Sequence, residues 1–315
     1  HYPLRRQRQM CIRDSVQVIN KKELEKNGGT TLLNSLEKVE GVSTINQGVG
    51  VSKPVIRGMS GNRIIVNDLG IKQEGQQWGM DHGLEIDQFA IENIQVLKGA
   101  SSLMYGSDAM AGVLNITPDI QLDTNTYLHN AQTFYRSNNH TKGLTIGSKG
   151  RSKDFSYKFR VSGSTYQDYQ VPTDNYTYLG YVLPIYNNQL KNTGGKELHI
   201  NTSVGLKKKW GYQYITVSNY HQKIGVFSGA TGLPREYNLS PNDPNEIELH
   251  YQFINTFKII SNSNLKVKKN WLEMDLGFQI NDRKEFEKAV AHGFPINKGD
   301  SLGVDLQLIT FSWNI

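Results

Sequence analysis

Apolar and polar residues alternate one by one along several segments in the second half of the chain. Residues 272–281 read LEMDLGFQIN, in which an apolar side chain is followed each time by a polar residue or glycine. The same alternation appears in residues 155–162 and 198–207. A period of two places successive side chains on opposite faces of a strand, so one face can meet lipid while the other meets water. The pattern therefore predicts β-strands that are apolar on one face only.

Eight such segments can be counted, with links of unequal length between them. The links after the third, fifth and seventh segments are long, and those after the second, fourth and sixth are short. This alternation is expected when loops and turns lie on opposite sides of a membrane, although the first link, near residues 138–139, is short as well. We therefore expect an antiparallel transmembrane β-barrel. The segments span residues 127–136, 141–149, 154–166, 197–208, 212–224, 248–260, 271–283 and 302–314.

The first part of the chain has a different pattern. A short strand is expected at residues 16–19, and two helical pieces at residues 21–26 and 30–39 are divided by two glycines. Strand-like segments then continue as far as residue 117. The sequence thus predicts a compact α+β domain over residues 16–118 and a barrel segment over residues 119–315. Barrels that hold a plug have about 22 strands, so we expect a barrel truncated after about eight.

Composition and charge exclude several classes of protein. The chain contains no run of 18 apolar residues, which excludes a transmembrane helix, and its mean hydropathy is −0.51. Half of the net charge of +6 lies in residues 1–15, which contain the single cysteine, Cys11, and lack the apolar centre of a secretory signal. We interpret residues 1–15 as a non-native leader. The remaining residues show no concentrated basic face, so a nucleic-acid partner is not expected.

A lone GxxG sequence, Gly58 to Gly61, superficially resembles the backbone-clamping loop of a KH domain. That loop joins two helices, whereas the residues after Arg63 are β-branched and favour a strand. The motif therefore does not indicate RNA binding.

Residues 91–116 contain the most specific sequence motifs in the chain. The motifs Leu97-Lys98-Gly99 and Tyr105-Gly106-Ser107 are followed by AGVLNI at residues 111–116. Together with RG at residues 57–58 and RIIVND at residues 63–68, their order closely resembles the plug domain of TonB-dependent outer-membrane receptors. The residues that carry this plug motif are Gly58, Gly99, Tyr105, Gly106, Gly112 and Asn115.

The resemblance implies a fold, a location and a function. Members of this family hold the plug inside a large barrel in the outer membrane of Gram-negative bacteria and import scarce nutrients. The implied partners are a TonB-type energising protein of the inner membrane, outer-membrane lipid and a small nutrient ligand, with no cofactor required. Basic residues at the positions of Arg57 and Lys98 help to seat the family's plug, and Arg63 is a third candidate. Glu273 and Asp275 are candidate partners on the barrel wall.

The candidate ligand site lies in the stretch QEGQQWGMDHG at residues 73–83, where family plugs present apical loops. The pair Asp81-His82 resembles the Asp-His pair of receptors for zinc and related metals, and both side chains are suitable zinc ligands. The link over residues 284–300 adds Glu285, Glu287 and His292 on the same side of the membrane. We therefore predict that Asp81, His82 and His292 bind a transported, zinc-like metal ion. Alternatively, Trp78 belongs to an aromatic platform for an iron chelate, such as a siderophore or haem.

Other functions stay open at this point. The chain has no HExxH, GxSxG or P-loop motif and no paired-cysteine metal site, so nothing indicates an enzyme. A passive outer-membrane pore or an adhesin would keep the barrel without active import. A soluble β-rich glycan-binding protein would need a second sheet to cover the apolar strand faces.

Overall fold

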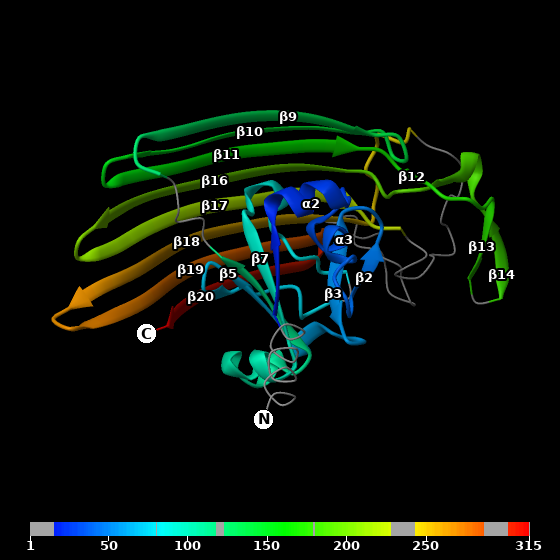
Figure 1. The fold of residues 1–315 in the computed structure, drawn as a ribbon. Helices are drawn as coiled ribbons and strands as arrows, with labels where there is room; N and C mark the ends of the chain where they lie inside the picture. The colour runs from blue at the N-terminus through cyan, green and yellow to red at the C-terminus, as the bar shows by residue number, and fades with distance from the viewer. Residues whose placement is uncertain are drawn as a thin grey trace, which may run out of the picture.

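The computed structural model describes residues 16–79, 81–117, 123–178, 180–227, 243–286 and 302–314. It contains a mixed α/β domain and a curved sheet of long strands, and the sheet arches over the domain (Figure 1). We call residues 16–117 the plug and the curved sheet the wall. The plug lies on the concave side of the wall, as the sequence predicts.

The plug is built around a five-stranded sheet with the order β1-β7-β8-β5-β6 and a smaller sheet of β2, β3 and β4. In the main sheet β5 and β8 are parallel, and the other neighbours are antiparallel. The plug strands are β1 (Val16–Asn20), β2 (Val42–Gln47), β3 (Val51–Ile56), β4 (Met59–Ser60), β5 (Ile64–Asp68), β6 (Ile71–Lys72), β7 (Asn93–Lys98) and β8 (Gly112–Thr117). Its helices are α2 (Lys21–Asn27), α3 (Leu32–Leu36), η1 (Gly61–Arg63), η2 (Gln88–Ala90), η3 (Gly99–Tyr105) and η4 (Ser107–Ala109).

Local chemistry explains where the plug helices begin and end. Asn20 caps α2 with its side chain and receives the reciprocal bond from Glu23, and Gly28 ends the helix in the left-handed conformation. Thr31 caps α3, which is shorter than the predicted piece at residues 30–39. Apolar side chains of α3 and of the central strands β7 and β8 form the buried core between helices and sheet; Leu36, Ile94, Val96 and Leu114 are fully buried. The core fixes the plug as one unit.

The wall consists of eight antiparallel strands in chain order, β9 to β11 and β16 to β20, and it is an open sheet with β9 and β20 at its edges. All eight predicted segments are confirmed as strands. The sixth was predicted too short, because its pairing with β19 continues to Val267. The wall strands are β9 (Thr126–Arg136), β10 (Thr141–Ser152), β11 (Phe155–Tyr166), β16 (Gly195–Lys208), β17 (Gly211–Gly225), β18 (Tyr251–Val267), β19 (Asn270–Phe286) and β20 (Leu302–Asn314).

Links of two residues follow β10, β16 and β18, and the links after β11, β17 and β19 are long. We call the side of the wall where the two-residue links lie the turn end, and the opposite side, where the long links lie, the loop end. The long link between β11 and β16 contains short elements at the loop end. They are β12 (Tyr169–Gln170), β13 (Asn175–Tyr178), β14 (Tyr181–Pro184), η5 (Tyr186–Asn188) and β15 (Gln189–Leu190).

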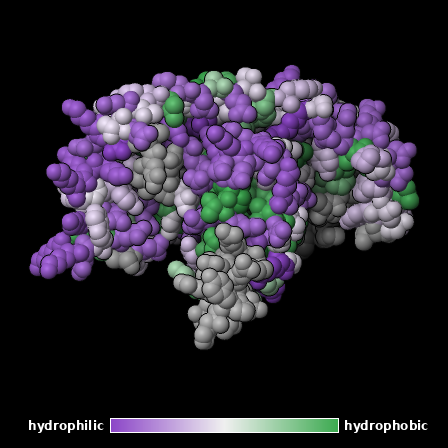
Figure 2. Space-filling model, in the orientation of Figure 1, coloured by the Kyte–Doolittle hydropathy of each residue, from purple (hydrophilic) through white to green (hydrophobic). Residues whose placement is uncertain are grey.

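The two faces of the wall differ in the way the alternation predicts. On β19 the buried residues Gly277, Gln279 and Asn281 face the plug, whereas Leu272 and Leu276 on the alternate face are about 40% exposed. An apolar convex face suits lipid, and a polar concave face suits a polar plug. Figure 2 shows the side of the molecule on which the plug lies; this side is mostly hydrophilic, with an apolar patch over the plug. No helix in the described part of the chain is long and apolar enough to cross a membrane.

Candidate functional site

Polar side chains join the plug to the wall along β18 and β19, and we call this line of contacts the seam. Near the turn end, Asn262 donates to the carbonyl oxygen of Leu69. Next along β18, Lys258 forms an ion pair with Asp68 of the plug and donates to Gln73 at 3.0 Å. Further towards the loop end, buried Arg283 pairs with buried Glu85 at 2.5 Å. The seam therefore holds the plug by oppositely charged groups, with the carboxylates on the plug and the cations on the wall.

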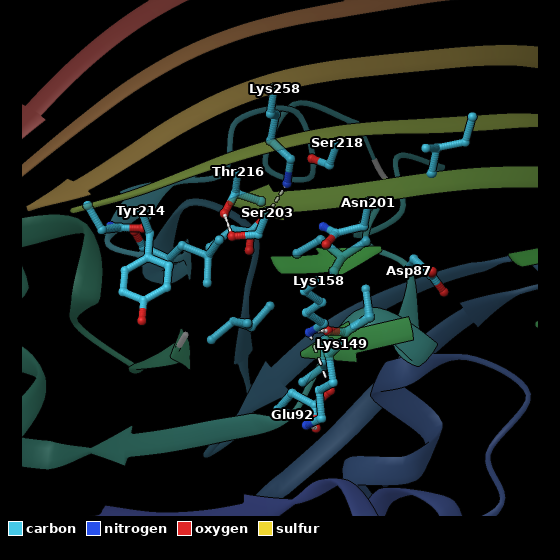
Figure 3. Close-up of a pocket in the computed structure, with 18 of the residues that line it drawn as sticks. Asp87, Glu92, Lys149, Lys158, Asn201, Ser203, Tyr214, Thr216, Ser218 and Lys258 are labelled. Carbon is cyan, nitrogen blue, oxygen red and sulfur yellow. Dashed lines mark hydrogen bonds and ion pairs between the residues drawn. The ribbon is translucent and has the colours of Figure 1, made fainter. Parts of the chain in front are cut away.

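Three lysines surround Glu92 of the plug, away from the seam, where the plug faces β10 and β11 of the wall. The Nζ atoms of Lys149 and Lys158, both from the wall, lie 3.3 and 3.4 Å from its carboxylate oxygens, and that of Lys21 lies at 3.7 Å. Burial raises the pKa of the Glu92 carboxyl, but the three ammonium groups outweigh burial and bring its pKa below the ordinary value. Figure 3 shows Glu92, Lys149 and Lys158 beside a cavity of about 90 Å³ between plug and wall, which is enough for several water molecules.

The lowered pKa of Glu92 predicts a pH-dependent hold on the plug. The stabilising contribution of its carboxylate is fully present above the ordinary pKa of 4.5 and is lost as the pH falls below it. We expect the thermal stability of the intact protein in detergent to fall over this range. We also expect Glu92→Gln to lower the melting temperature by a few degrees at neutral pH and to flatten the acid dependence. Glu25→Gln, at an exposed position of α2, is the control; an equal effect there would contradict a specific role for Glu92.

The residues predicted to seat the plug make other contacts in the described part of the chain. Lys98 is buried inside the plug, where its Nζ donates to the Gln17 side chain at 2.9 Å and to the carbonyl oxygen of Glu40 at 2.7 Å. Arg57 and Arg63 are exposed, and their side chains make no hydrogen bond or ion pair among the described residues. Their seating role stays a prediction.

The proposed wall partners and the plug-motif residues can also be placed. Asp275 accepts a hydrogen bond from Asn262 of the wall at 2.7 Å, and Glu273 is exposed. Gly58, Gly99 and Gly106 have positive φ angles of 78°, 67° and 97°, which side chains disfavour. Gly112 is packed so closely that a Cβ atom there would lie 2.7 Å from the carbonyl oxygen of Leu97. Tyr105 packs against the small core cluster of β5, β7 and β8, and Asn115 bonds Gln95. These motif residues therefore shape the plug itself.

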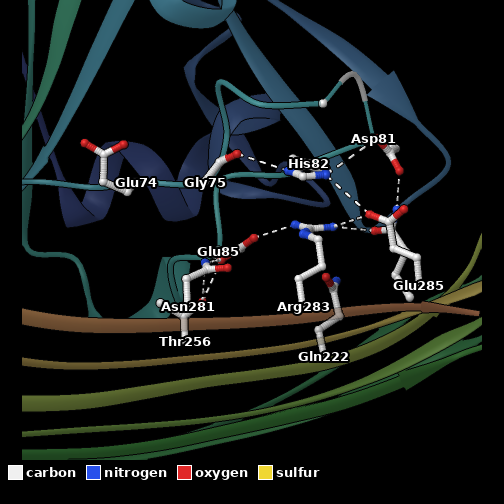
Figure 4. A network of polar contacts seen from close by, with 12 residues as sticks. Glu74, Gly75, Asp81, His82, Glu85, Gln222, Thr256, Asn281, Arg283 and Glu285 are labelled. Carbon is white, nitrogen blue, oxygen red and sulfur yellow. Dashed lines mark hydrogen bonds and ion pairs between the residues drawn. The ribbon is translucent and has the colours of Figure 1, made fainter. Parts of the chain in front are cut away.

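Three potential metal ligands meet at the loop end of the seam. They are Asp81 and His82 from the plug loop between β6 and η2, and Glu285 from β19, and their ligand atoms all lie within 4.8 Å of one another (Figure 4). His82 Nε2 is 3.3 Å from Glu285 Oε1 and 3.9 Å from Asp81 Oδ1. Two nitrogen or oxygen ligands of a tetrahedral zinc ion lie roughly 3.3 Å apart, so side-chain movements of about 1–2 Å would complete three bonds. We call these residues the metal cluster.

Hydrogen bonding orients His82 for this role. Its Nδ1 lies 3.1 Å from the carbonyl oxygen of Gly75, which can only accept, so Nδ1 carries a proton. In the neutral ring the lone pair then lies on Nε2, which faces both carboxylates (Figure 4). In that form three electron-rich atoms converge, and a bound cation would balance them. A backbone carbonyl that fixes the second ring nitrogen is the usual support of a metal-binding histidine.

Gly79 lies close against two of these ligands. A Cβ atom built on Gly79 would lie 2.6 Å from His82 Cδ2, 2.7 Å from Asp81 Oδ1 and 2.8 Å from His82 Nε2, so a side chain there would clash with both residues. Lys53 donates to the carbonyl oxygen of Gly79 and fixes the loop from β3. Gln252 of the wall donates to Asp81 and fixes its carboxylate. Trp78, on the same loop, is 42% exposed and is free to meet a ligand.

The structure changes one part of the predicted metal site and leaves another undecided. Glu285 was assigned to the link after the seventh segment, but β19 extends to Phe286 and carries Glu285 into the cluster. His292 and Glu287 lie outside the described residues. Sequence reasoning missed Glu85, Gln252 and Arg283. Arg283 continues the buried series 277, 279 and 281 of β19. This alternation could have predicted that Arg283 faces the plug and therefore needs a partner there.

Comparison with known proteins decides the family. Residues 8–113 match the family model of the TonB-dependent Receptor Plug Domain. Residues 8–113 of the chain therefore belong to the plug-domain family of TonB-dependent receptors. Over 143 residues the receptor is 34% identical to the vitamin B12 transporter BtuB of Vibrio vulnificus strain YJ016, a match that covers 44% of this chain and 23% of that protein. Over 109 residues it is 34% identical to an iron-regulated outer membrane virulence protein of Vibrio cholerae, covering 32% of this chain and 17% of that protein.

The fold agrees with this family. The ferric enterobactin receptor PfeA of Pseudomonas aeruginosa superposes with a TM-score of 0.66 at 14% identity, covering 95% of this chain and 44% of that one. The receptor thus has a plug and part of an outer-membrane β-barrel, and it is a protein of the Gram-negative outer membrane. It spans less than a quarter of the length of the curated relatives it matches. The plug match begins within residues 1–15, whose origin stays a prediction.

Proposed function

We propose that this receptor takes up a divalent metal ion of the zinc type, bound by Asp81, His82 and Glu285 at the outer end of the seam. The observation that carries the proposal is the convergence of one imidazole nitrogen and two carboxylates, whose ligand atoms lie within 4.8 Å of one another. One nitrogen and two oxygen ligands leave a fourth position of a tetrahedral zinc site for water or a further side chain. His292, predicted from the sequence, is a candidate for that position.

The donor set favours a transition-metal ion over calcium or magnesium. Imidazole suits zinc, copper, iron and nickel, whereas calcium and magnesium prefer sites built only from oxygen. The cluster supplies two negative charges for a doubly charged ion, if His82 is neutral. The ligands come from two bodies, the plug loop and the wall, so a displacement of the plug would divide the site. That arrangement suits cargo that must be released after it is bound.

Energy for the release would come from a TonB-type protein of the inner membrane acting on the plug, as the family membership supports. Names of relatives do not decide the cargo, because they include a vitamin B12 transporter and an iron-regulated protein. An iron chelate that contacts Trp78 is the second candidate, since this side chain is large, aromatic and exposed on the loop that carries Asp81 and His82.

Zinc titration of the intact receptor in detergent tests the metal proposal. Removal of one of three protein ligands weakens zinc binding, so we expect His82→Ala to lower zinc affinity by on the order of 100-fold. Trp78→Ala is the control, because its side chain is not a metal ligand. Equal zinc affinity of wild type and His82→Ala would reject the metal site. Tight binding of an iron chelate that is lost only in Trp78→Ala would favour the second candidate.

A further inference from the structure

Arg283 lies between two carboxylates that belong to different bodies. Its side chain on β19 is 1% exposed, and its Nη2 donates to Glu85 of the plug at 2.5 Å. Its Nη1 lies 4.0 Å from Glu285 of the metal cluster and donates to Gln252 at 2.7 Å. Figure 4 shows the guanidinium group between these partners. The arginine is thus within electrostatic reach of both the seam and the metal cluster.

Glu85 is held in place by the wall. Its carboxylate accepts hydrogen bonds from Thr256 at 2.6 Å and Asn281 at 2.5 Å in addition to the bond from Arg283. Its backbone φ angle is 53°, a left-handed conformation that residues other than glycine rarely adopt. Such a conformation persists only where the surroundings impose it. The plug segment around Glu85 is therefore kept in this position by contacts that a moving plug would lose.

Arg283 belongs to the wall, so it stays in place when the plug moves. While Glu85 is in place, its carboxylate balances the arginine, and Glu285 is available to the metal. When Glu85 withdraws, the arginine becomes a buried cation without its main partner, which is strongly unfavourable. Glu285, two residues along the same strand, is then the nearby carboxylate that can balance it.

We propose that Arg283 determines release of the metal by replacing it on Glu285 once the plug withdraws Glu85. This rests on the metal cargo proposed above. Arg283 acts on the metal through Glu285 and is therefore a positioning residue rather than a ligand. Lys53 is a cation that interacts with Asp81, but it belongs to the plug and moves with the loop, so it does not serve this role.

The proposal predicts opposite effects from two variants that break the same ion pair. Glu85→Gln imitates the withdrawn plug, frees Arg283 to compete for Glu285, and is expected to lower zinc affinity on the order of tenfold. Arg283→Gln removes the competing cation and is expected to raise zinc affinity by a similar factor. If Arg283 and Glu85 only hold the structure together, both variants lower zinc affinity.

The double variant, Glu85→Gln with Arg283→Gln, leaves neither charge unpaired and is expected to bind zinc more tightly than Glu85→Gln alone. Thermal unfolding of each variant checks that it folds. Lys258→Gln is a matched control, because it breaks another ion pair of the seam six residues along β18 from Gln252, roughly 20 Å away at the rise of a strand. We expect its zinc affinity to equal that of the wild type.

The measurement is calorimetric titration of the intact receptor in detergent with zinc ion alone. If the wild type binds no zinc, the proposed cargo is wrong. If the wild type binds zinc and both single variants weaken binding, or neither changes it, the role of Arg283 is wrong and the metal site stands. Opposite shifts in the two variants support the release role.

Discussion

Gly79→Ala is expected to weaken zinc binding strongly while the plug stays folded. The added methyl group would lie 2.7 Å from Asp81 Oδ1 and 2.8 Å from His82 Nε2, so it either occupies the position of the ion or pushes the two ligands apart. The φ angle of Gly79 lies outside the left-handed region, so alanine fits its backbone. We expect a loss of zinc affinity on the order of 100-fold, measured by calorimetric titration, with little change in melting temperature.

Gly83→Ala is the matched control on the same loop. A Cβ atom there has its nearest described neighbour at 3.6 Å, an ordinary van der Waals distance, and it makes no contact with a ligand atom. It should therefore bind zinc like the wild type. A Gly79→Ala receptor that still binds zinc at wild-type affinity would show that the ion, if any, binds elsewhere. Equal losses in both variants would indicate a general effect on the loop.

The fold of the wall was predictable because its signal is local. Alternation along a strand assigns each side chain to a face, and pairing of neighbours in chain order needs no long-range information. The ends of the strands were harder to predict, and this error affected the predicted metal site. Glu285 looked like a loop residue because the alternation was followed only to residue 283, whereas pairing with β18 continues to Phe286.

The contacts between plug and wall were predicted less well, because they join residues far apart in the chain. Sequence reasoning looked for cations on the plug and carboxylates on the wall. The described seam has the opposite polarity, with Lys258 and Arg283 on the wall and Asp68 and Glu85 on the plug. Alternation shows that a charged residue faces inwards, but it does not identify the partner across the interface. The partner follows only when the plug is placed inside the sheet.

Close packing also holds the plug against the wall, and Gly277→Val is expected to dislodge it there. Gly277 of β19 faces Ile71 of β6, which is 1% exposed. A Cβ atom on Gly277 would lie 2.7 Å from both Cγ atoms of Ile71, closer than packed carbon atoms approach. Valine adds two further methyl groups, so the plug must shift or the strand must bend. Overpacking of this kind costs about 1–3 kcal/mol, comparable with several hydrogen bonds of the seam.

Electrical conductance of the intact receptor in a planar bilayer measures the result, since a plug displaced from the wall leaves a water-filled path for ions. We expect Gly277→Val to conduct and its plug to be cleaved faster by trypsin, while the wild type stays closed. Gly163→Val on β11 is the control, because a Cβ atom there meets its neighbours only at 3.6 Å and 3.7 Å. A closed Gly277→Val receptor with wild-type resistance to trypsin would mean that the polar contacts hold the plug without this packing. In that case the ion pairs of Lys258 and Arg283 would carry the hold, and breaking both should open the path.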